Sequence, residues 1–142
     1  MPGRHPFIHI RSSKFPVLPG EDEELVNEGT YGKALSLYLK GRLMDRGYEV
    51  PFICCEDWGW WVEISGNHFA TGVCVYATEA LPESKELCVV AAPDPGRKWS
   101  WRRFRFVETT DIAAKLQADL MAILNGDSEI EVIGLTEAYP LS

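Results

Sequence analysis

Two apolar runs, residues 57–64 and 69–77, flank the dipeptide Gly66-Asn67, and this arrangement predicts a β-hairpin. With Gly66-Asn67 as a two-residue turn, side chains that face each other share one side of the hairpin. The expected pairs are Ile64 with Phe69, Val62 with Thr71, Trp60 with Val73 and Trp58 with Val75. These pairs form an almost wholly apolar face, and a slip by one residue would move Trp58 and Trp60 to the polar face.

The remaining chain predicts a single α+β domain over residues 1–142. Three- and four-residue apolar spacing predicts a helix at 30–46, with Thr30 as N-cap and Gly47 after its end. A second helix should run from cap residues at 109–111 to Asn125-Gly126. Expected strands cover residues 7–10, 48–55, 57–64, 69–77, 87–92 and 99–108, with a possible short final strand at 129–133.

The order β-α-β-β-β-β-β-α, with the possible final strand, predicts how these elements pack. Pro51 cannot donate a ladder hydrogen bond, so either the strand at 48–55 lies at a sheet edge or the Pro51 nitrogen faces away from a partner strand. The continuous apolar run at 87–92 is typical of a central strand. We therefore expect a mostly antiparallel five- or six-stranded sheet with two helices packed on one face.

Composition favours a soluble globular protein. The chain is 46% hydrophobic and 25% charged, and its formal net charge of -7 opposes long-range attraction to nucleic acid and anionic membranes. No apolar run approaches the roughly 18 residues of a membrane span, and the first residues lack a signal-peptide pattern. We expect a cytoplasmic protein. The stretch from His9 to Ile64 resembles small bacterial proteins of similar length, and this resemblance implies no activity.

The cysteines and histidines do not form a pattern that predicts catalysis. Cysteines occur at 54, 55, 74 and 88 in apolar runs without a Cys-x-x-Cys pair. The even count permits disulfides, but we interpret these residues as buried free thiols. His5, His9 and His68 lack a spacing that would place any of them beside an activated nucleophile.

Metal and nucleotide sites are not indicated either. In Cys54-Cys55-Glu56-Asp57, adjacent strand residues point to opposite faces, so the four side chains cannot all reach one ion. Glu56 and Asp57 could work as paired carboxylates only if a bend breaks that alternation. The glycines lack the spacing of a phosphate-binding loop. We expect no cofactor, and we favour a protein that is not an enzyme.

The face opposite the apolar side of the hairpin is the candidate binding surface. Tryptophan and arginine are enriched at binding hot spots, and several should point away from the core there. The predicted surface consists of Trp61, Glu63, Trp101, Arg103 and Arg105. A structural role competes for Trp61, because it should lie opposite Gly72 and aromatic side chains often cover strand glycines. The basic and aromatic run at 97–105 could bind single-stranded nucleic acid, although the acidic balance of the chain disfavours this.

Two functional hypotheses follow from these residues. The first is a protein-interaction module of the inhibitor or immunity type, which uses this surface and the acidic run at 21–24; most such runs are exposed loops. The alternative is a small-molecule-binding domain or small enzyme with an aromatic pocket and one carboxylate. The pocket residues would be Tyr31, Tyr38, Trp58 and Trp60, with Glu56 or Asp57.

Overall fold

The computed structural model describes residues 5–65, 71–77, 83, 85–92, 97–100, 105–108 and 110–137, with the backbone alone at 97–100, 105–108, 110 and 111. The elements are β1 (Phe7–Arg11), α1 (Glu21–Glu24), α2 (Lys33–Asp45), β2 (Ile53–Cys55), β3 (Trp60–Ile64), β4 (Thr71–Ala77), β5 (Glu86–Ala91), β6 (Arg97–Ser100), β7 (Arg105–Glu108), α3 (Thr110–Asn125) and β8 (Glu131–Thr136). Six strands form one antiparallel sheet in the order β2-β3-β4-β5-β1-β8. The α+β prediction is confirmed.

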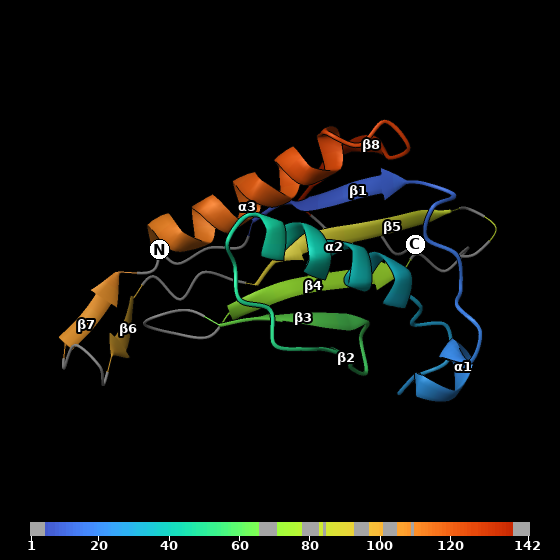
Figure 1. Cartoon of the computed structure of the whole chain (residues 1–142), viewed down its shortest axis with the longest axis horizontal. Coiled ribbons are helices and arrows are strands. Elements are labelled where there is room, and N and C mark those ends of the chain that lie inside the picture. Colours follow the sequence, from blue (N-terminus) through green and yellow to red (C-terminus); the bar gives the residue numbers. More distant parts are fainter. Residues whose placement is uncertain are drawn as a thin grey trace.

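Helices α2 and α3 lie side by side on the same face of this sheet (Figure 1). In α2 the buried leucines recur every four residues, at 35, 39 and 43, and in α3 they recur at 116, 120 and 124. That spacing aligns each set on one side of its helix. Both sets pack against alternate sheet residues, which are Ile8, Ile10, Val62, Val73, Val75 and Val89.

The β3–β4 pairing differs from the predicted register by two residues. Trp60 pairs with Val75 and Val62 with Val73, so the predicted faces are retained although the partners are wrong. Gly66-Asn67 as a two-residue turn would pair Ile64 with Phe69, whereas Ile64 pairs with Thr71, so the predicted turn position is wrong. A shift by two preserves side-chain parity, and for this reason the hydrophobic pattern could not detect it.

Trp58 does not belong to the core beside Trp60, contrary to expectation. The chain bends at 57–59, and β3 begins only at Trp60. At Gly59 the Val75 carbonyl oxygen lies 2.4 Å from the position of an added Cβ, so the backbones approach too closely for a side chain there. This bend breaks the alternation, and Trp58 packs on the opposite side of the sheet.

Helix α2 starts three residues later than predicted, and its start depends on the acidic run. Gly32, not Thr30, is the N-cap, and glycine has no side chain that could accept a hydrogen bond. The buried carboxylate of Glu21 substitutes for a cap by accepting the backbone N–H groups of Gly32 and Lys33 at 2.9 and 3.1 Å. The expectation of an exposed loop at 21–24 is correct for the exposure of Asp22, Glu23 and Glu24, but the four residues form α1 and Glu21 is buried.

The C-terminal end of α2 and both sheet edges agree better with the sequence. Gly47 has a φ of 95° and donates to the Met44 carbonyl, while Tyr48 donates to that of Leu43, as in a Schellman motif. The short β2, after Pro51, is an edge strand as predicted. The final strand forms β8 at the other edge, two residues later than expected, and pairs with β1.

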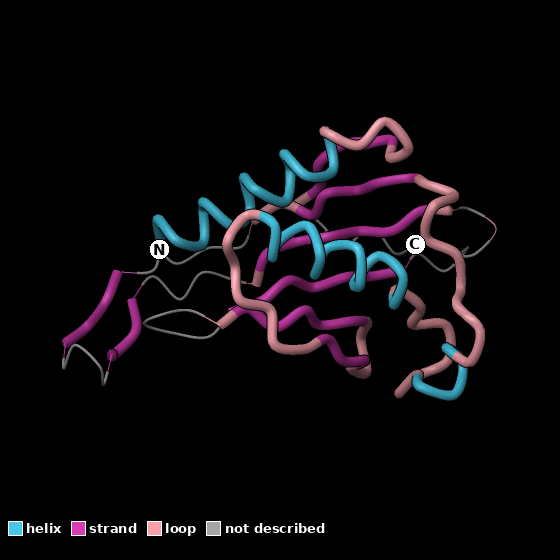
Figure 2. The backbone as a smooth tube through the Cα atoms, viewed as in Figure 1, coloured by secondary structure: helices cyan, strands magenta, loops and turns pink. Residues whose placement is uncertain are grey.

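The strand expected at 99–108 is replaced by a hairpin. Strands β6 and β7 pair with each other, with Arg97 opposite Glu108 and Ser100 opposite Arg105, in a separate two-stranded sheet. In Figure 2 this hairpin projects beyond the end of the main sheet. The residues at 99–108 favour β structure throughout, so the sequence did not indicate that the chain would form two paired strands here.

Candidate binding surface

The sheet face opposite α2 and α3 carries a second hydrophobic cluster. Its buried members are Phe7, Cys74 and Val90, from β1, β4 and β5. Three half-buried aromatic residues pack on them: Trp58, Trp61 and Tyr76. Among the described residues, no helix contributes to this cluster, which we call the aromatic face.

The rings of the aromatic face contact one another. Tyr76 lies between Trp58, at 5.1 Å between ring centroids, and Phe7, at 5.7 Å. The Phe7–Tyr76 contact is edge-on, which is a favoured aromatic geometry. These contacts limit the rotamers of the three rings, so the surface is preorganised before any partner binds.

Trp61 was predicted either to cover Gly72 or to bind a partner, and its surroundings bear on both roles. Its indole ring lies over Gly72, with Cζ2 only 2.3 Å from where an added Cβ would be. Its Nε1 donates to Glu63 Oε1 at 2.6 Å. The predicted contact with Gly72 is therefore present, although Trp61 pairs with Cys74 in the ladder. The ring remains half-buried, and no helix covers it within the described part of the chain.

Charged side chains border the aromatic face on the β1, β5 and β8 side. His9 Nε2 lies 2.8 Å from one carboxylate oxygen of Glu86, and Arg11 lies 3.3 Å from the other. Arg11 also reaches Glu131 on β8 at 3.4 Å. The aromatic centre is thus bordered by both signs of charge, which is the usual composition of a protein-binding patch.

The thiols on this side of the sheet are not activated. Burial raises the pKa of Cys88 to about 12 and also raises that of Cys74. Burial, together with a hydrogen bond to Glu56, raises the pKa of Cys54 to about 11. A nucleophilic thiol needs the opposite shift. All four cysteines are free; Cys74 and Cys88 are buried as predicted, and Cys54 and Cys55 are half-buried.

The five residues of the predicted surface are only partly placed. Trp61 and Glu63 lie on the aromatic face. Arg105 lies on β7, in the separate two-stranded sheet. Trp101 and Arg103 lie outside the described residues. Sequence parity could not identify Trp58 as a neighbour of Trp61, because the bend before β3 breaks the alternation.

The residues of the alternative aromatic pocket do not share one wall. Trp60 is buried on the helix side and donates to the Thr30 carbonyl at 3.0 Å, whereas Trp58 is on the aromatic face. Tyr31 donates to Asp22, and Tyr38 donates to Asp127. Glu56 is half-buried next to the bend that includes the exposed Asp57.

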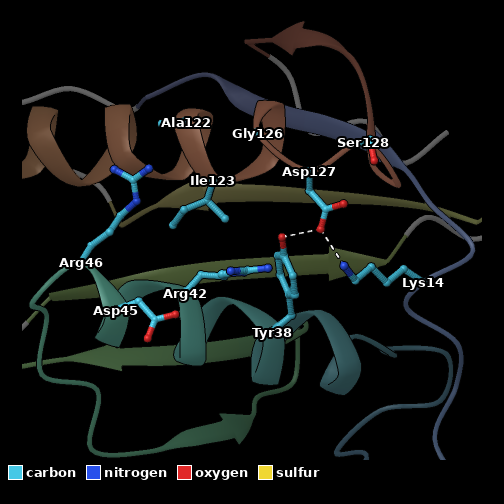
Figure 3. A pocket seen from close by; sticks show the side chains of 10 residues that line it. All are labelled: Lys14, Tyr38, Arg42, Asp45, Arg46, Ala122, Ile123, Gly126, Asp127 and Ser128. Carbon is cyan, nitrogen blue, oxygen red and sulfur yellow. Dashed lines mark hydrogen bonds and ion pairs between the residues drawn. The ribbon is translucent and has the colours of Figure 1, made fainter.

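A cavity of about 410 Å³ lies between α2 and α3, and sequence analysis did not predict it (Figure 3). Its lining consists of Lys14, Tyr38, Arg42, Asp45, Arg46, Ala122, Ile123, Gly126, Asp127 and Ser128. Arg42 of α2 and Arg46, the C-cap of that helix, are four residues apart, and this spacing was the available sequence signal. Nothing in the sequence showed that α3 would end opposite them.

Comparisons of this chain with protein-family models, with curated proteins and with solved structures found no match. Within the described ranges, no group of three or more histidine, cysteine or acidic side chains could hold a metal ion. None of the helices described here is long and apolar enough to cross a membrane.

Proposed function

We propose that this protein is a non-enzymatic interaction module that binds a protein partner through its aromatic face. The observation that carries the proposal is the cluster of Trp58, Trp61 and Tyr76 on the side of the sheet away from α2 and α3. Tryptophan and tyrosine dominate the energetics of protein interfaces because each buries a large area with few rotatable bonds.

The border of the aromatic face favours a protein over a small apolar ligand. His9, Arg11, Glu63 and Glu86 bring both signs of charge to it. A partner with apolar side chains at its centre and mixed charges at its edge would complement this arrangement. An inhibitor or immunity-type factor, which acts by occupying a partner, needs no catalytic group. The free thiols fit the reducing cytoplasm that we propose as its location.

The role of the acidic run is narrower than the sequence suggested. Glu21 caps α2, Asp22 accepts from Tyr31 at 2.5 Å, and Glu24 pairs with Lys33 at 2.5 Å. These contacts hold the start of α2 in place. We therefore assign partner binding to the aromatic face and a structural role to the acidic run.

The test begins with tagged wild-type protein and the Trp61→Ala variant, used for affinity purification from the native host. Met44→Ala is the matched control, because Met44 is 51% exposed and belongs to α2 on the other side of the sheet. A partner should be recovered with wild type and Met44→Ala and lost with Trp61→Ala. Circular dichroism must show that each variant is folded.

The interaction is then reconstituted from purified proteins and its Kd is measured. We expect Trp61→Ala to raise Kd by about tenfold or more, the effect of a hot-spot residue. Glu63→Gln keeps an acceptor for the indole N–H and should raise Kd by a smaller factor through the lost charge. If folded Trp61→Ala and Glu63→Gln both bind as tightly as Met44→Ala, the aromatic face is not the binding surface.

A further inference from the structure

The cavity between α2 and α3 has an uneven charge distribution that is independent of the aromatic face. Three cationic side chains, Lys14, Arg42 and Arg46, line it together with two acidic ones, Asp45 and Asp127. The lining is thus net positive in a chain whose net charge is -7. Such local reversal of the overall sign attracts anions to one place on the surface.

Two of the three cations form ion pairs, although Asp119, the partner of Arg46, is shared with Lys115. Lys14 Nζ lies 2.6 Å from Asp127 Oδ2, and Arg46 lies 3.1 Å from Asp119 on α3. No carboxylate lies within ion-pair distance of Arg42 among the residues described. Its guanidinium instead lies 5.3 Å from the centre of the Tyr38 ring, a cation–π contact. Arg42 also interacts with the Tyr38 hydroxyl, but a guanidinium has five N–H donors, so others remain for a ligand in the cavity.

A chain of contacts positions Arg42. The Tyr38 hydroxyl donates to Asp127 at 2.7 Å, and Asp127 is held in turn by Lys14 and by the Glu129 backbone N–H. Phe15 packs edge-on against the Tyr38 ring at 5.1 Å. The Tyr38 ring is therefore held at its hydroxyl by Asp127 and along its side by Phe15. Because Arg42 packs on this fixed ring, binding a ligand costs less side-chain entropy at Arg42.

The cavity also offers an apolar wall. Figure 3 shows Ile123 of α3 facing Arg42 and Tyr38 of α2 across the opening. Its volume of about 410 Å³ lies within the ~300–1,000 Å³ that is usual for small-molecule sites. A ligand that fits would combine an anionic group, for the guanidinium, with a compact apolar or aromatic part, for Ile123 and Tyr38.

We propose that this cavity binds a small organic anion, with Arg42 contacting its carboxylate or phosphate group and Arg46 close by. Guanidinium groups bind both kinds of oxyanion in a forked geometry. Asp45, which also lines the cavity, opposes the anion and sets a limit on affinity. The ligand is thus a weakly held small molecule rather than a polyanion.

The test uses three probes: phenyl phosphate, benzoate and inorganic phosphate. Binding is followed by calorimetry and by amide shifts in ¹H–¹⁵N NMR spectra. We expect phenyl phosphate or benzoate to shift the signals of Tyr38, Ile123 and their neighbours. Binding of only one of the two identifies the anionic group, and inorganic phosphate should bind more weakly because it lacks the apolar part.

Matched variants distinguish specific binding in the cavity from general electrostatic attraction to the protein. Arg42→Gln should weaken binding by about tenfold, Arg42→Lys by less, and Asp45→Asn should strengthen it a few-fold. Lys40→Gln is the control, since it removes one positive charge from α2 outside the cavity lining. The proposal is overturned if Arg42→Gln and Lys40→Gln have equal effects, or if neither organic probe shifts the lining signals at millimolar concentration.

Discussion

The substitution Glu21→Gln should destabilise the protein strongly, although Glu21 lies in an acidic run that the sequence alone suggests is exposed. The Glu21 carboxylate is 1% exposed and accepts three backbone N–H groups. One oxygen accepts from Leu18 at 2.9 Å, and the other accepts from Gly32 at 2.9 Å and Lys33 at 3.1 Å at the start of α2. A glutamine has nearly the same shape but only one accepting oxygen.

The magnitude follows from these three contacts. If the glutamine oxygen faces Gly32 and Lys33, its NH₂ group faces the Leu18 N–H, and one buried donor loses its acceptor. Hydrogen bonds to charged groups contribute about 1.5–3 kcal/mol each, and a negative charge at a helix N-terminus adds up to ~2 kcal/mol. One lost and two weakened bonds should therefore lower the free energy of unfolding by about 2–4 kcal/mol, a large part of the usual ~5–15 kcal/mol.

Urea unfolding at neutral pH measures this loss, and Glu23→Gln is the matched control. Glu23 lies in the same short helix but is exposed, so the same change there should stay within about 0.5 kcal/mol. Hydrogen exchange should also show faster exchange of the Gly32 and Lys33 amides in Glu21→Gln. If the two variants unfold at the same urea concentration with equal slopes, Glu21 does not cap α2.

Three further predictions address helix propensity, acid stability and thiol reactivity. Gly41→Ala should raise the free energy of unfolding by about 0.5–1 kcal/mol in urea, because Gly41 is inside α2 and nothing lies within 4 Å of the added Cβ; a lower midpoint would contradict this. Hydrogen bonds, first from Lys14 and then from Tyr38, hold the pKa of Asp127 well below its usual range. This stabilisation is present above the unfolded-state pKa of about 3.9 and is lost as pH falls further, so Asp127→Asn should flatten the acid decline of the unfolding free energy; an unchanged decline would refute the assignment. Burial raises the pKa of Cys88 to about 12, so iodoacetamide at about pH 8 should label it only in urea, as followed by mass spectrometry; equal labelling rates in folded and unfolded protein would contradict this burial.

The features that sequence predicted correctly are those that a local pattern determines. Leucines at four-residue spacing in α2 and α3 define one buried side each, whatever they pack against. Pro51 makes the β2 segment an edge, and Gly47 ends α2, because each residue acts through its own backbone. The faces of β3 and β4 were predictable for the same reason, since alternation is a property of each strand.

The features that sequence missed depend on contacts between distant segments. Alternation repeats every two residues, so it could not distinguish Trp60 opposite Val73 from the observed Trp60 opposite Val75. The burial of Glu21 requires the start of α2 to lie beside α1, which no local charge pattern shows. The cavity likewise requires Asp127, after α3, to meet Tyr38 on α2.

Gly72→Ala gives a direct test of the Trp61 geometry on which the proposed surface depends. The added Cβ would lie 2.3 Å from Trp61 Cζ2 and 2.6 Å from the Val62 carbonyl oxygen, so the ring or the strand must move. In Trp61→Ala the ring contact is absent, but the clash with the Val62 oxygen remains. Gly72→Ala should therefore cost less unfolding free energy in the Trp61→Ala background than in wild type, and a double-mutant cycle measures the difference.

Equal costs in the two backgrounds would mean that the indole does not lie over Gly72. A clearly smaller cost in the Trp61→Ala background would place the indole over Gly72 and would show how strongly the ring and the sheet depend on each other. Glu63→Gln then measures what the Glu63 charge contributes to partner binding. This variant leaves the Trp61 ring over Gly72 and keeps an acceptor for Nε1. Trp61 can thus support the sheet and bind a partner, since the ring lies on Gly72 and is still only half-buried.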